Sequence, residues 1–216
     1  MNVSGAHSIK SFSSLSFTRL TGMIIIRHRI NTIEELIKTP KEYGIEADIR
    51  PWNGRLILHH EPHQQGEDLE EYLKSFSHAF FIANIKSEGI EKEVIKLLTK
   101  YGIKNYFLLD VTFPFMIKLS NEGMRDLAVR FSEYESLDTC MFMKDRAKWV
   151  FIDVYTQFPL KQVSYKKLSS LFKLCLVSPE LLARPEDIKN YQELMNKQGM
   201  RIDAVLTKRP EDWKSF

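Results

Sequence analysis

The chain has 216 residues, of which 44% are hydrophobic and 27% charged, and this composition excludes a wholly disordered protein and allows one domain with a sizeable core. The formal net charge is only +3, and no run of five like charges occurs, so the charge balance indicates no nucleic-acid partner. No apolar stretch approaches the ~20 residues that a membrane span needs.

Residues 1–22 differ in composition from the rest of the chain. They contain six serines, Lys10 and Arg19 but no acid, and they lack the apolar core of a secretory signal. One interpretation, which we favour, is a misassigned start, with Met23 as the true initiator. The other is a disordered, transit-like leader. Both leave residues 23–216 as a single domain.

Eight short apolar runs follow, and helical stretches separate them. Nearly continuous apolar runs are typical of strands that are buried on both faces. The eight runs cover residues 23–27, 45–49, 80–85, 105–110, 126–131, 149–155, 173–177 and 203–207. A further run, 55–59, follows the turn signal Asn53-Gly54, and we interpret it as an extension of the loop after the second strand.

Three of the intervening stretches have helical patterns that end in glycine, the usual stop signal, at Gly44, Gly102 and Gly199. Strict alternation of strand and helix predicts an α/β fold with a parallel sheet. Eight repeats of ~25 residues favour a compact, single-domain (β/α)8 TIM barrel. An open, doubly wound sheet is the alternative, but the glycine-rich phosphate loop that usually follows its first strand is absent.

Barrels of this kind place their chemistry at the carboxyl ends of the strands. There Glu46 and Asp48, two positions apart on one strand, share a face, and two buried carboxylates repel each other unless positive charge lies between them. One divalent cation, Mg²⁺ or Ca²⁺, is the natural partner of such oxygen ligands. The structural alternative is a salt bridge to Arg29, Arg50 or Lys86.

Two histidines at the same strand ends, His28 and His60, could act as general base and general acid near neutral pH. Arg29 and Lys86 would supply the positive charge that a phosphodiester needs. A second group of residues is expected to line the rim and recognise a hydroxylated, sugar-like group, with ordinary packing as the alternative. This group consists of Arg130, Glu133, Asp153, Trp52 and Trp149.

Five motifs in order resemble the glycerophosphodiester phosphodiesterase family, which shares its barrel with phosphatidylinositol-specific phospholipase C. They are HRINT (28–32), EADIR (46–50), NGRLILHHE (53–61), NIK (84–86) and LTKRP (206–210), and AVRFSEYE (128–135) is similar to the family's fifth-strand region. The resemblance implies a role in lipid metabolism and the following site: His28 and His60 catalytic, Arg29 and Lys86 phosphate-binding, and Glu46, Asp48 and Asn84 metal-binding.

Several positions depart from the family pattern. Ile30 replaces a glycine and is expected to add bulk beside the phosphate site, while Asn84 replaces a glutamate and should lower the affinity for metal. Glu88 or Asp110 could compensate for the lost charge. Lys208 stands where the family has an aspartate, and HHEPHQQGEDLEE (59–71) is the expected remnant of a larger insertion.

The favoured function is metal-dependent hydrolysis of a small phosphodiester, such as a glycerophosphodiester or a sugar-phosphate ester. The first alternative is a non-catalytic barrel that binds phosphate or sugar phosphate, and the second is a metal-independent lyase that forms a cyclic phosphate. Retention of both histidines favours catalysis over binding alone. The two cysteines, Cys140 and Cys175, have apolar neighbours and no zinc-binding spacing, which predicts buried, reduced thiols and a cytoplasmic protein. Nothing in the sequence indicates an oligomeric state.

Overall fold

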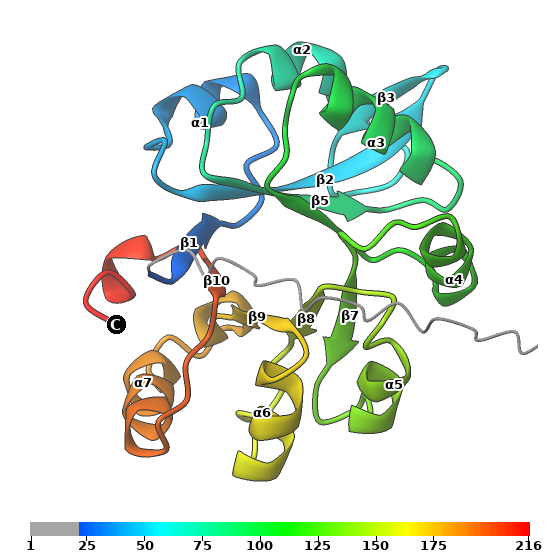
Figure 1. Cartoon of the computed structure of the whole chain (residues 1–216). Coiled ribbons are helices and arrows are strands. Elements are labelled where there is room, and N and C mark those ends of the chain that lie inside the picture. The colour runs from blue at the N-terminus through cyan, green and yellow to red at the C-terminus, as the bar shows by residue number, and fades with distance from the viewer. Residues whose placement is uncertain (1–21) are drawn as a thin grey trace, which may run out of the picture.

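The computed structural model describes residues 22–216, so the predicted leader or misassigned start, apart from Gly22, lies outside the described residues. Strands and helices alternate along the chain, and the helices lie outside the curled sheet (Figure 1). The elements are β1 (Ile24–Arg27), α1 (Ile33–Lys38), β2 (Gly44–Trp52), β3 (Arg55–Leu58), β4 (Glu67–Asp68), α2 (Leu69–Lys74), β5 (Phe80–Ile85), α3 (Glu91–Lys100), β6 (Tyr106–Leu109), α4 (Phe113–Asn121), β7 (Ala128–Phe131), α5 (Leu137–Phe142), β8 (Trp149–Ile152), α6 (Gln162–Ser169), β9 (Lys173–Val177), η1 (Pro179–Leu182), α7 (Asp187–Lys197), β10 (Ala204–Thr207) and η2 (Pro210–Asp212).

Parallel ladders join the strands that form from the eight predicted runs. They run from β6 through β5, β2, β1, β10, β9 and β8 to β7. Between β6 and β7 the structure has a single bridge, Leu108 to Leu127, in place of a ladder. The predicted α/β fold with a curled parallel sheet is therefore confirmed. The run 55–59 is also confirmed as an extension, because β3 pairs antiparallel with the far end of β2.

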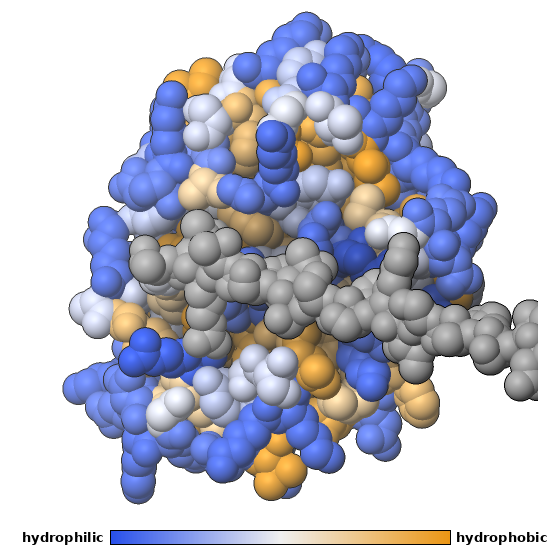
Figure 2. Space-filling view, viewed as in Figure 1, coloured by the Kyte–Doolittle hydropathy of each residue, from blue (hydrophilic) through white to orange (hydrophobic). Residues whose placement is uncertain are grey.

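Two apolar layers hold the sheet. The outer layer lies between the strands and the helices, whose outward surfaces are mostly hydrophilic (Figure 2). The inner layer fills the inside of the sheet and includes Phe80, Phe107 and Trp149, whose ring centroids are 5.1–5.7 Å apart. Each of these rings lies at the start of its strand, so they close the end of the sheet opposite the carboxyl ends of the strands. Trp149 is therefore buried in the inner layer, which confirms packing as its role and contradicts a role in recognition at the rim.

Gly44 has a different role from the helix stop that its sequence context predicts. Helix α1 already ends at Lys38, and Gly44 begins β2. A Cβ atom at Gly44 would lie 2.8 Å from Cγ1 of Ile26 and 3.1 Å from Cβ of Phe80, both of which are buried. The glycine is therefore needed for close packing inside the sheet. Gly102 and Gly199 do follow their helices, with φ of 69° and 62°.

We expect Gly44→Ala to lower the free energy of unfolding by about 1–3 kcal/mol, because the added methyl group overpacks a filled interior. Urea denaturation followed by circular dichroism measures this change. A midpoint equal to that of the wild type would show that Ile26 and Phe80 can move aside and that the contact is not restrictive.

Candidate active site

The predicted metal-binding residues come together at the carboxyl ends of the strands, which we call the mouth of the sheet. The alternate residues of β2, such as Ile45 and Ala47, belong to the outer layer, so Glu46 and Asp48 face inward, and each is only 1% exposed. Asn84 lies beside Asp48 in the register of β5 with β2. Its Nδ2 donates to Oε1 of Glu46 at 2.8 Å and to Oδ1 of Asp48 at 3.2 Å.

Burial and the neighbouring Asp48 charge raise the pKa of Glu46 to about 7, against the lowering effect of hydrogen bonds from Asn84 and from the Arg29 backbone. The Arg29 N–H donates to Oε2 of Glu46 at 2.7 Å. A carboxyl group with this pKa is partly protonated at neutral pH. The donors and positive groups around Glu46 and Asp48 therefore do not fully offset the repulsion between their two negative charges.

Asp48 has its own set of partners. The Asn31 amide donates to its Oδ2 at 3.0 Å, and its backbone N–H donates to Oδ1 of Asn31 at 2.9 Å. Nζ of Lys86 lies 3.4 Å from its Oδ1, and Nε of Arg29 lies 4.0 Å from its Oδ2. The salt-bridge alternative thus has support at Asp48. Arg50 donates instead to the backbone carbonyls of residues 59, 60 and 86.

Whether these groups fit a divalent cation depends on Asn84. Within residues 22–216, no three His, Cys, Asp or Glu side chains are grouped as metal ligands. Two carboxylates are nevertheless adjacent, and Oδ1 of Asn84 is buried without a hydrogen-bond partner. A carboxylate pair and an unpaired amide oxygen are suitable ligands for Mg²⁺ or Ca²⁺. The residues fit a cation, provided that the amide presents its oxygen.

His28 follows β1, and its backbone N–H donates to the carbonyl of Thr207 at 3.0 Å. Its Nε2 lies 3.9 Å from Oε2 of Glu46. Burial, assisted by the charges of Arg29 and Lys208, lowers the pKa of His28 to about 4. The ring is therefore neutral at pH 7 and can accept a proton.

His60 lies at the same mouth, after β3, and Arg29 connects it to the carboxylates. Nη2 of Arg29 is 2.5 Å from Nε2 of His60, and because a guanidinium group can only donate, Nε2 must accept. Nδ1 then carries the ring proton and donates it to Oε1 of Glu61 at 2.6 Å. This contact orients the ring. Glu61 is a neighbour that the sequence reasoning assigned no role.

Hydrogen-bonded ion pairs continue across the mouth from β5 to β8. Nζ of Lys86 is 3.0 Å from Oδ2 of Asp110, and Arg130 donates from Nε to Oδ1 of Asp110 at 2.9 Å. Arg130 also pairs with Asp153. The charges of Arg130 and Lys86 outweigh burial and lower the pKa of Asp110. Asp110 therefore connects Lys86, predicted to bind phosphate, with Arg130, predicted to lie at the rim. The place of Asp110 at a strand end could have suggested this role.

The expectations about compensation and about bulk have different outcomes. Asp110 is bonded to Lys86 and Arg130, and Glu88 accepts from Thr112, so compensation by either acid stays a prediction. The Ile30 side chain is 5% exposed and belongs to the outer layer rather than lying beside the phosphate site. Ile30 is not among the positive-φ residues, so its backbone does not require glycine.

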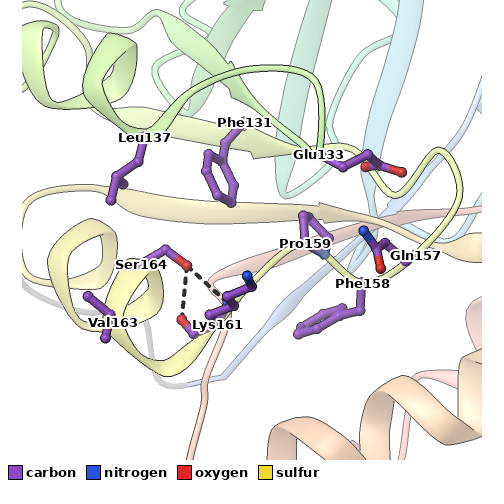
Figure 3. A pocket seen from close by; sticks show the side chains of 9 residues that line it. All are labelled: Phe131, Glu133, Leu137, Gln157, Phe158, Pro159, Lys161, Val163 and Ser164. Atoms are coloured by element: carbon purple, nitrogen blue, oxygen red, sulfur yellow. Dashed lines mark hydrogen bonds between the residues drawn. The ribbon is translucent and has the colours of Figure 1, made fainter.

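Glu133 does not join the network at the mouth. Its Oε1 accepts from the backbone N–H of Thr156 at 2.5 Å and from the Thr156 hydroxyl at 2.9 Å. It lines a separate cavity of about 440 Å³ beside the first turn of α6. Figure 3 shows the side chains of Phe131 and Leu137 on one side of this cavity and Ser164 on the other. The remaining rim prediction, Trp52, is the half-buried last residue of β2.

Comparison with known proteins gives a match in structure alone. No protein-family model matches the sequence, and no curated protein matches it. Two crystal structures from Agrobacterium tumefaciens C58, described as glycerophosphoryl diester and glycerophosphodiester phosphodiesterases, match with TM-scores of 0.64 and 0.63 at 15% and 14% identity. The matches cover 88% and 89% of this chain and 95% and 99% of those chains.

A glycerophosphoryl diester phosphodiesterase structure from Parabacteroides distasonis matches with a TM-score of 0.59 at 12% identity, covering 88% of this chain and 84% of that chain. The chain therefore has the α/β fold of these phosphodiesterase structures. The predicted resemblance to glycerophosphodiester phosphodiesterases is confirmed at the level of the fold. None of the helices in residues 22–216 has the length and apolar character that crossing a membrane requires.

In the metal-free protein we expect the His28 ring to titrate near pH 4, because burial and nearby cations disfavour its charged form. Since this pKa lies below the usual 6.5, protonation favours unfolding, and His28 reduces stability as the pH falls from 6.5 towards 4. NMR of the imidazole signals measures the midpoint, and His28→Gln identifies the signal by its loss. A midpoint between 6 and 7 would contradict the burial of this ring.

We expect Asp110→Asn to destabilise the protein by about 1.5–3 kcal/mol, because Lys86 and Arg130 lose a shared charged acceptor. Asparagine tolerates the left-handed backbone of this position, where φ is 58°, so the change isolates the effect of charge. Thermal unfolding at low and high salt measures the loss. As a matched control, Asp126→Asn removes a single ion pair, with Lys148, and should have a smaller effect.

Proposed function

We propose that this chain is a phosphoric diester hydrolase that requires one divalent cation and acts on a small phosphodiester, such as a glycerophosphodiester or a sugar-phosphate ester. The observation that carries the proposal is the meeting of His28, His60 and the carboxylate pair at one mouth. Arg29 contacts three of these groups through its backbone and side chain. The fold of the phosphodiesterase structures supports the same reaction class.

Binding of the phosphate group is assigned to Arg29 and Lys86. The Arg29 side chain is 40% exposed and its contact with His60 is at the surface, so it can turn towards a substrate. Lys86 is 17% exposed and is held between Asp48 and Asp110. A mobile guanidinium group and a fixed ammonium group together would neutralise the charge that develops on the phosphoryl oxygens.

Proton transfer is assigned to the two histidines. His28 is neutral at pH 7 and would accept the proton of the attacking hydroxyl group or water. When Arg29 turns to the phosphate, Nε2 of His60 is released; it would first take up a proton from solvent and would then give that proton to the departing alcohol. Glu61 holds the ring in place through Nδ1 during this exchange.

A divalent cation held by Glu46, Asp48 and Asn84 would supply positive charge beside the phosphoryl group when bound. The residues at the rim, Arg130 and Asp153, would contact the leaving alcohol. They form an ion pair at the ends of β7 and β8, where hydroxyl groups could hydrogen-bond to them.

Two further parts of the proposal have separate support. The single bridge between β6 and β7 supports closure of the sheet as a complete (β/α)8 barrel. Cys140 and Cys175 are buried free thiols, which supports a cytoplasmic location. A glycerophosphodiester substrate would place the reaction in lipid metabolism.

A second candidate function is phosphate or sugar-phosphate binding without turnover. Asn84 favours it, because the site has one acid fewer than the family pattern and its amide nitrogen is directed at both carboxylates. Ile30 no longer favours it, because its side chain lies in the outer layer. The hydrogen bond from His60 to Glu61 favours catalysis, since simple binding does not need an oriented imidazole.

We expect the protein to hydrolyse bis(p-nitrophenyl) phosphate in the presence of Mg²⁺ or Ca²⁺ and to lose this activity in EDTA. His28→Ala and His60→Ala should each lower kcat by about 10²–10⁴-fold, because proton transfer is lost. His78→Ala is the matched control, since His78 bonds to the Thr39 carbonyl away from the mouth.

Phosphate binding without turnover and without a metal requirement would establish the binding barrel instead. A glycerophosphodiester substrate that yields a cyclic phosphate without metal would establish the lyase. Equal activity in the His28 and His60 variants and in the wild type would remove the proposed acid–base roles.

A further inference from the structure

We propose that the side-chain amide of Asn84 turns over when a divalent cation binds. Its nitrogen faces Glu46 and Asp48 in the metal-free protein, and its oxygen faces the cation in the metal-bound protein. This inference rests on the proposed cation of the function above, but it concerns binding and not catalysis.

The metal-free orientation follows from the hydrogen bonds of the amide. Nδ2 lies 2.8 Å from Oε1 of Glu46 and 3.2 Å from Oδ1 of Asp48, so both of its N–H groups have acceptors. The opposite orientation would place Oδ1 against a carboxylate oxygen of Asp48 and against that of an ionised Glu46. Such contacts are repulsive, and the inward nitrogen is therefore favoured while no cation is present.

The amide oxygen shows that this orientation is a compromise. Oδ1 of Asn84 is buried and has no hydrogen-bond partner, although Asn84 is only 7% exposed. A buried oxygen without a donor is unfavourable, and almost all buried polar atoms in proteins are paired. The inward nitrogen thus satisfies the carboxylates while the oxygen stays unsatisfied.

A cation between the carboxylates reverses this balance. The amide nitrogen has no lone pair available for a metal and carries partial positive charge, whereas the amide oxygen is a good ligand for Mg²⁺ and Ca²⁺. Turning the amide by half a rotation supplies a third oxygen and gives Oδ1 a partner. Lys86 can keep its ion pair with Asp110, in which Asn84 takes no part.

The exchange has a consequence for affinity. The metal-free protein has internal donors that a cation must displace, and the ligand set has two negative charges instead of three. Both effects weaken binding relative to a three-carboxylate site. The metal-free protein gains stability from the same donors, so the cation should be exchangeable and its affinity modest.

The test follows the Asn84 amide signals by ¹⁵N-edited NMR while the wild-type protein is titrated with Mg²⁺ or Ca²⁺. Asn84→Leu identifies the signals by their absence. We expect both amide proton signals to shift and to saturate at the affinity that calorimetry measures. Asn84→Glu should bind the cation about tenfold or more tightly and melt at a lower temperature without metal. Asn84→Leu should bind about tenfold or more weakly.

Asn196→Glu, which adds an acid at an exposed position of α7, is the matched control and should change neither value. Amide signals that do not move at saturating cation, or a Leu variant that binds as tightly as the wild type, would overturn the inference. So would the absence of cation binding in both the wild type and the Glu variant. Cation binding with a turned amide but no phosphodiester hydrolysis would overturn the proposed function alone.

Discussion

The side-by-side burial of Glu46 and Asp48 is the constraint on which the rest of the mouth depends. Two acids that are 1% exposed need hydrogen-bond donors and positively charged side chains around them, and the neighbouring strands provide these one after another. Asn84 donates to both acids, and Lys86 approaches Asp48. Asp110 then holds Lys86 and continues the pattern to β7. Each charged group thereby gains a partner from another strand, and the mouth acquires a defined arrangement.

The backbone at this mouth carries strain at two of its functional positions. Arg29 and Asp110 have φ of 54° and 58°, in the left-handed region that glycine usually occupies. The sharp turn after β1 lets the Arg29 backbone N–H reach Glu46 while its side chain reaches His60. The turn after β6 directs Asp110 at Lys86 and Arg130. The hydrogen bonds of Arg29 and Asp110 hold both backbone conformations. The strain is therefore the cost of directing these two residues at their partners.

Much of the fold could be predicted from the sequence because strands buried on both faces leave continuous apolar runs, and all eight formed strands. The convergence of His28, Glu46 and Asn84 followed from their places at strand ends. The sequence could not show which way each side chain would face. The inner packing around Gly44, the orientation of the Asn84 amide and the outward position of Ile30 depend on contacts between distant strands. Short-range patterns contain no record of these contacts.

The junction of β6 and β7 has one bridge, Leu108 to Leu127, where every other neighbouring pair has a ladder. Arg130 and Asp110 form their ion pair across this same junction, above the bridge. Side chains there replace part of the cohesion that backbone hydrogen bonds supply elsewhere. Loss of the contact between Arg130 and Asp110 would therefore weaken the junction between β6 and β7. The cohesion of the sheet at this junction thus depends in part on one guanidinium group, which also pairs with Asp153 at the end of the next strand.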